Sequence, residues 1–142
     1  MDCGGLNSPV NAGDAADRAM LRERRETLDV LVLTHPHQDH VNGAERLLLE
    51  THVRTLILPA AADAEAEPLR SILKTAERRG TEILRLEDDA EMTLGDLGLQ
   101  FFVRLGQETE DGCLMLRVTR GGFDTMITGD VPIETETVLA AD

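Results

Sequence analysis

Residues 34–40, with the sequence Thr-His-Pro-His-Gln-Asp-His, constrain the fold of this chain more than any other stretch. They hold three of its four histidines and one carboxylate, and they overlap the end of a short apolar run, LDVLVLT at 28–34. That run is rich in apolar and β-branched residues and is bounded by charged residues and by His-Pro, which predicts a buried strand. A strand end is a rigid platform, and Pro36 restricts the backbone between the first two histidines. We therefore expect a fold in which one buried strand presents several polar side chains on a single loop.

The polar side chains of this loop are of the kinds that bind divalent metals. Imidazole and carboxylate groups suit Zn²⁺, Mn²⁺ and Fe²⁺. Alternate positions on an extended turn can point His35 and His37 to the same side, and the adjacent pair Asp39 and His40 can face a second metal. Histidines solvated on a surface loop are the alternative, and they explain this crowding poorly. The remaining histidine, His52, is expected to be a surface or partly buried structural residue.

The elements around this loop are expected to alternate between helix and strand in the first half of the chain. Helical spacing predicts helices over 14–26, 41–50 and 67–79, and apolar runs predict further strands over 53–59 and 81–86. Such alternation favours parallel strands with helices packed on the sheet.

In the second half of the chain, the spacing of the apolar residues changes to one typical of strands. Two hairpins are expected, one within 92–105 and one within 113–128, and 132–141 returns to helical spacing. The fold class is therefore mixed α/β, with parallel units first and antiparallel hairpins second. The length of 142 residues suits one domain, over residues 1–142.

The net charge of −13 bears on the partners of the chain. Proteins that grip nucleic acid through many phosphate contacts usually carry a basic stripe. Here the densest basic group, Arg22, Arg24 and Arg25, is interrupted by Glu23, which favours a solvated helix face. A wide electrostatic footprint for nucleic acid is not expected from this segment, although a bound metal would add local positive charge.

Hydropathy and the number and spacing of the cysteines bear on the cellular compartment of the protein. No apolar run approaches the ~20 residues that a membrane-spanning helix needs, and the polar amino end does not resemble a signal peptide. The two cysteines, Cys3 and Cys113, lie far apart and form no metal-binding spacing, so we expect reduced residues near the core. As given, the chain is expected to be soluble and, by default, cytoplasmic.

The sequence HPHQDH at 35–40 resembles the HxHxDH signature of the metallo-β-lactamase superfamily, with that family's usual strand before it and helix after it. Residues 126–130 (MITGD) resemble the family's later strand-end Gly-Asp, whose carboxylate bridges two metals. Residues 2–5 (Asp-Cys-Gly-Gly) resemble the Asp-x-Gly turn that follows the family's first hairpin, although a plain glycine-rich turn explains them nearly as well.

This resemblance implies a fold and a set of ligands. The fold would be an αββα sandwich, truncated at both ends in this chain. His35 and His37 would hold one divalent metal, Asp39 and His40 a second, and Asp130 would lie between them. The metals would be Zn or Mn, up to two ions, and Asp39 and Asp130 would be the catalytic residues. The family's terminal histidine motif has no counterpart before Asp142.

A finer resemblance is to the carboxy-terminal domain of ComEC-type DNA-internalisation (competence) proteins. It is carried by the stretches 5–16 and 111–131, and by Glu134 and Glu136 after Gly-Asp. In most of the superfamily a metal-binding histidine precedes the strand that begins near 113. ComEC-like domains have Asn and Ser there, and this chain has Asp-Gly-Cys, so both lack that histidine.

The resemblance implies a metal-dependent hydrolase that acts on DNA phosphodiesters during DNA uptake. The alternatives are a small-molecule metallo-hydrolase that cleaves thioesters or lactones, which the acidic charge favours, and a catalytically inactive fragment. The expected partners are therefore DNA or a small-molecule substrate. A ComEC-like parent protein would be in the plasma membrane, through segments absent here. Because a truncated sandwich leaves apolar faces uncovered, we also expect self-association.

Overall fold

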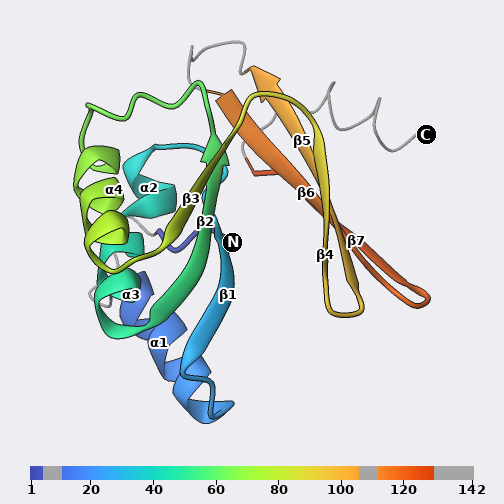
Figure 1. The fold of residues 1–142 in the computed structure, drawn as a ribbon, viewed down its shortest axis with the longest axis horizontal. Helices are drawn as coiled ribbons and strands as arrows, with labels where there is room; N and C mark the ends of the chain where they lie inside the picture. Colours follow the sequence, from blue (N-terminus) through green and yellow to red (C-terminus); the bar gives the residue numbers. More distant parts are fainter. Residues whose placement is uncertain (5–10, 106–111, 130–142) are drawn as a thin grey trace.

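The computed structural model describes residues 1–4, 11–105 and 112–129. Their elements form a layer of helices, a parallel sheet of three strands and an antiparallel sheet of four strands (Figure 1). The predicted class, mixed α/β with parallel units followed by hairpins, is confirmed. Within these ranges, no helix combines the length and the apolar character needed to cross a membrane.

The parallel sheet is the middle layer, with the strand order β1 (Thr27–Val32), β2 (His52–Pro59) and β3 (Glu82–Leu86). Side chains alternate across it because successive residues of a strand point to opposite faces. Leu31 packs among the helices, whereas its neighbour Val32 packs against the antiparallel sheet. Both faces are therefore covered, in agreement with the uninterrupted apolar stretches at 30–33 and 56–58.

Three helices cover one face of this sheet: α1 (Ala12–Arg22), α3 (Ala44–Glu50) and α4 (Leu69–Arg78) (Figure 1). The first helix begins where the Asn11 side chain accepts a hydrogen bond from Gly13 N at 2.8 Å, a standard N-cap. Its predicted extension to residue 26 is wrong. The helix ends at Arg22 because Arg24 has a φ of 52°, a left-handed conformation that a right-handed helix cannot contain.

The single helix predicted over 41–50 is in fact two. A short helix, α2 (Gln38–Val41), starts inside the histidine loop, and α3 follows after a break at Gly43. The Gly43 amide donates to the carbonyl oxygen of Cys3 at 2.7 Å, and a Cβ at position 43 would lie 2.2 Å from the same oxygen. The helix is therefore interrupted where the amino-terminal segment packs against it.

The antiparallel sheet is built from two hairpins, as predicted. Its strands, in the order in which they pair, are β4 (Ala90–Leu94), β5 (Leu97–Leu105), β6 (Gly112–Arg120) and β7 (Phe123–Ile127). The two tight turns contain Gly95 and Gly121, with φ values of 62° and 55° that favour glycine. The helix predicted over 132–141 lies outside the described residues.

The two sheets enclose an apolar core. Ile57 of the parallel sheet is 1% exposed, and Phe101 and Leu114 of the antiparallel sheet are 2% and 0% exposed. These residues belong to one cluster that spans both sheets. This core fixes the antiparallel sheet against the strand that leads into the histidine loop.

A conservative truncation should show how much the packing between the two sheets contributes to the free energy of unfolding. Ile57→Val should lower the free energy of unfolding by about 0.5–1.5 kcal/mol, because it removes one buried methylene and leaves a small cavity. The matched control is Ile127→Val, at a side chain 40% exposed on β7, which should change it by less than about 0.5 kcal/mol. Urea unfolding of both variants gives the comparison; equal losses would argue against a tightly packed interface between the sheets.

The outer face of the antiparallel sheet has a second apolar cluster, formed by Cys113, Met115, Phe102 and Met126. In the described part of the chain no helix lies on this face (Figure 1). The outer helix layer of the predicted αββα sandwich would fall on 132–141, which the structure does not describe. Self-association through an uncovered sheet stays a prediction.

Candidate metal centre

The loop after β1 brings its three histidines together. The ring centroids of His35 and His37 are 4.7 Å apart in an edge-to-face arrangement, and those of His35 and His40 are 3.9 Å apart. Asp39 Oδ2 lies 3.5 Å from His40 Nε2. His35 is 4% exposed, whereas His37 and Asp39 are exposed. The structure therefore gathers all four predicted side chains of this loop around the end of one buried strand.

The short helix α2 determines how the second half of the loop turns. The amides of His40 and Val41 donate to the carbonyl oxygen of His37 at 2.9 and 3.2 Å, and Val41 is fully buried. Asp39 and His40 thus lie in a helical turn. The expectation of an extended turn holds only before His37, which precedes the helix with an extended φ of −67° and ψ of 142°.

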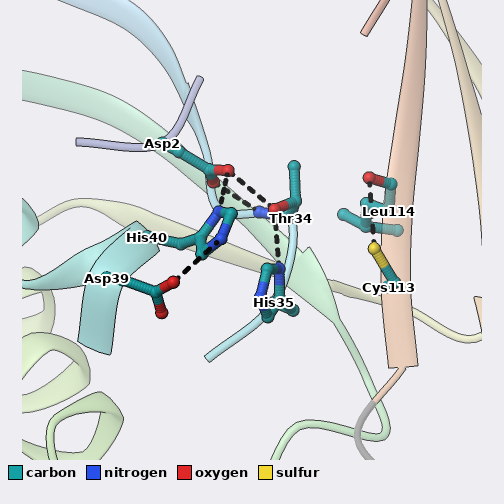
Figure 2. Close-up of polar contacts among 7 residues, drawn as sticks. All are labelled: Asp2, Thr34, His35, Asp39, His40, Cys113 and Leu114. Atoms are coloured by element: carbon teal, nitrogen blue, oxygen red, sulfur yellow. Dashed lines mark hydrogen bonds and ion pairs between the residues drawn. The ribbon is translucent and has the colours of Figure 1, made fainter. Parts of the chain in front are cut away.

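Asp2 also belongs to this site. From the sequence, residues 2–5 could be either the family's Asp-x-Gly turn or a plain glycine-rich turn. Asp2 Oδ1 accepts from Thr34 N, and its Oδ2 accepts from Thr34 Oγ1, each at 2.7 Å. The same Oδ2 lies 3.0 Å from His40 Nδ1, and Thr34 Oγ1 lies 3.0 Å from His35 Nδ1 (Figure 2). One carboxylate is therefore linked to two of the three imidazoles, to His40 directly and to His35 through Thr34.

Backbone contacts hold the Asp2 segment in place. Asp2 N donates to Val32 O at 2.8 Å, and Cys3 N donates to His40 O at 3.0 Å. The next residue must be small, because a Cβ at Gly4 would lie 2.0 Å from the carbonyl oxygen of Asp39. This close approach, which only glycine permits, places the Asp2 carboxylate beside the histidines.

Cys3 and Cys113 are both buried thiols, as predicted. Burial raises the pKa of the Cys3 thiol to about 11, in spite of the opposing effect of the amino-terminal charge. Since the thiolate is the form that binds metals, this burial disfavours Cys3 as a metal ligand. The fourth histidine, His52, is exposed at the first position of β2, in agreement with the expected structural role.

Asp130 lies outside the described residues, but its neighbour in the sequence does not. Gly129, with a φ of 61°, lies against Thr34: a Cβ there would be 3.1 Å from Thr34 Cβ and 3.2 Å from its Oγ1. From β6, the Leu114 amide donates to Thr34 O at 2.8 Å (Figure 2 shows this strand beside the site). The antiparallel sheet therefore meets the loop at the residue before His35.

The donor chemistry of this loop fits a divalent metal, because imidazole nitrogen and carboxylate oxygen are ligands of Zn²⁺ and Mn²⁺. Over the ranges that the structure describes, however, no group of three or more His, Cys, Asp or Glu side chains is already placed to hold an ion. The loop brings the donors to one place without closing a cage among the described residues.

Comparison with known protein families identifies the superfamily of this chain. The family model described as the metallo-beta-lactamase superfamily matches residues 10–142. The chain belongs to this superfamily. Its fold is therefore that of a family of metal-dependent hydrolases, and the predicted resemblance to this superfamily is confirmed.

Two curated relatives of this superfamily member are similar over most of its length. It is 33% identical to ComE operon protein 3 of Bacillus subtilis over 115 residues, which are 77% of this chain and 14% of that protein. It is 32% identical to ribonuclease Z of Aeropyrum pernix over 109 residues, which are 70% of this chain and 35% of that protein. The chain thus spans well under half the length of either relative.

A solved structure shares the fold. The metallo-beta-lactamase fold protein YhfI of Bacillus subtilis superposes with a TM-score of 0.59 at 19% identity, over 91% of this chain and 48% of that one. At this identity the likeness shows the fold alone.

Proposed function

We propose that this chain is the histidine-loop part of a metal-dependent hydrolase. The observation that carries the proposal is the convergence of four donor side chains on one strand end, with two of the imidazoles hydrogen-bonded into a partly buried network. Structural histidines are seldom gathered in this way, because a packed core gains nothing from crowding polar rings. The superfamily membership supports the same reaction class.

We assign the donors as the family resemblance implies. His35 and His37 hold one ion, Asp39 and His40 hold the second, and Asp130 bridges the two. Support for Asp130 comes from the adjacent Gly129, which lies against the residue before His35. The ions are Zn or Mn, since both accept this donor set.

The chemistry follows from these assignments. When bound, a divalent metal would lower the pKa of a water that it coordinates and so supply hydroxide near neutral pH. Asp39 is exposed beside His40, so its carboxylate can orient a nucleophile as well as bind. A shallow depression of about 440 Å³ lined by Pro36, His37, Gln38, Glu67 and Pro68 lies next to the loop and gives a substrate room to approach it.

We propose a phosphodiester of DNA as the substrate class, in keeping with the resemblance to ComEC-type domains and the similarity to ComE operon protein 3. A parent protein of that type would act at the plasma membrane. The net charge of −13 favours a second candidate, a small-molecule thioester or lactone, because an acidic surface repels the phosphates of a long nucleic acid.

A paired hydrolysis assay tests this function. The purified chain is given a chromogenic phosphodiester and single-stranded DNA, or a thioester, each with Mn²⁺ or Zn²⁺ and each after chelation. We expect phosphodiester cleavage that requires added metal and falls to background with the chelator. Cleavage of the thioester alone would establish the small-molecule alternative. Absence of turnover together with absence of metal binding would refute the hydrolase proposal.

A further inference from the structure

The Asp2 carboxylate occupies a position from which it can control two metal ligands at once. Its Oδ2 is within hydrogen-bond distance of both Thr34 Oγ1 and His40 Nδ1, at 2.7 and 3.0 Å. Thr34 Oγ1 is in turn 3.0 Å from His35 Nδ1. His35 and His40 are the imidazoles that the proposed function assigns to different ions.

The direction of these hydrogen bonds follows from the chemistry of the groups. An ionised carboxylate only accepts, so the single hydroxyl proton of Thr34 is donated to Asp2. The lone pairs of Thr34 Oγ1 remain to accept, so His35 Nδ1 is the donor. His40 lies between two carboxylates, with Asp2 Oδ2 3.0 Å from Nδ1 and Asp39 Oδ2 3.5 Å from Nε2. The shorter contact makes Nδ1 the donor, and it donates directly to Asp2. Each neutral ring then has its proton on Nδ1 and its lone pair on Nε2.

We infer that Asp2 is a positioning residue that holds His35 and His40 in the Nδ1–H tautomer, so that both present the Nε2 lone pair to the ions. The inference rests on the proposed function for the identity of the ions, but the tautomers themselves can be measured without metal. A single carboxylate, distant in sequence from the loop, thus determines the tautomer of one histidine ligand of each ion.

A one-atom change should reverse both tautomers. In Asp2→Asn, the amide oxygen can still accept from Thr34 N, as Oδ1 does in the native chain. The NH₂ group then replaces Oδ2 and has two protons for its two neighbours. It donates to Thr34 Oγ1, whose own proton turns toward His35 Nδ1, and it donates to His40 Nδ1. Both rings must then carry their proton on Nε2, where it blocks the lone pair.

The test is nitrogen NMR of the histidine rings in the metal-free chain, recorded at a pH at which the spectra show both rings to be neutral. We expect Nδ1–H tautomers for His35 and His40 in the native chain and Nε2–H tautomers for both in Asp2→Asn. Thr34→Val serves as the second variant, because it removes only the link to His35 and should leave His40 on Nδ1–H. A native chain with either proton on Nε2, or unchanged tautomers in Asp2→Asn, would overturn the inference.

Metal titration of the same variants separates this inference from the proposed function. Loss of a hydrogen-bond partner of a ligand typically weakens metal affinity 10–100-fold. We expect that loss at both ion positions in Asp2→Asn and at one in Thr34→Val. The control is Asp17→Asn, where the carboxylate accepts from Thr51 Oγ1 at 2.9 Å away from the loop, and affinity should not change. Tautomers that reverse as expected in a chain that binds neither Zn²⁺ nor Mn²⁺ would sustain the role of Asp2 and refute the hydrolase proposal.

Discussion

Gly4→Ala should lower the free energy of unfolding by about 3 kcal/mol or more and should abolish tight metal binding. The new Cβ would lie 2.0 Å from Asp39 O, 2.3 Å from Asp39 C and 2.4 Å from His40 C. Overpacking usually costs 1–3 kcal/mol, and occasionally more. Here the obstacles are backbone atoms of α2, which cannot rotate away as a flexible side chain can. Relief requires that the amino-terminal segment or α2 move.

Either movement damages the site. Displacing the segment removes the Asp2 carboxylate from His40, and displacing α2 moves Asp39 and His40 themselves. Urea unfolding and Zn²⁺ titration measure the two effects. The control is Gly122→Ala, whose Cβ would meet nothing within 4 Å, and which should change stability by less than about 0.5 kcal/mol. A Gly4→Ala chain with native stability and native metal affinity would show that the segment does not support the loop.

The strand and the donors of the histidine loop could be predicted because their signal is local. The apolar run, the proline and the crowded histidines all lie within 28–40. The hairpins were predictable for the same reason, since glycines in the tight turns separate short apolar runs. The helix limits were less predictable. Nothing near Gly43 in the sequence indicates that its amide bonds to Cys3 rather than to its own helix.

The role of Asp2 could not be derived from local pattern. It depends on contacts with Thr34 and His40, which are 32 and 38 positions away. The one available signal was the Asp-Cys-Gly-Gly stretch, which alone is as well explained by an ordinary turn. The contact of Gly129 with Thr34 is likewise a tertiary feature. The family resemblance implied a place for Asp130, whereas the residue spacing carried no such information.

His37→Ala should reduce the bound metal by one ion and weaken metal-dependent hydrolysis by more than the 10–100-fold that loss of a ligand's hydrogen-bond partner costs. The side chain suits this test because it is exposed and makes no capping hydrogen bond to α2. Its removal should therefore leave the fold intact, whereas truncation of the buried His35 would also leave a cavity. Any loss of metal can then be assigned to the missing imidazole.

His52→Ala provides the matched control, since His52 is also an exposed histidine but lies at the first position of β2. Metal content of both purified variants, measured after dialysis against limiting Zn²⁺, gives the comparison. We expect His52→Ala to retain the native metal content and His37→Ala to lose one equivalent. Because the two substitutions remove the same group from similarly exposed positions, equal metal content would mean that His37 binds no ion, and the assignment of the loop as a metal centre would fail.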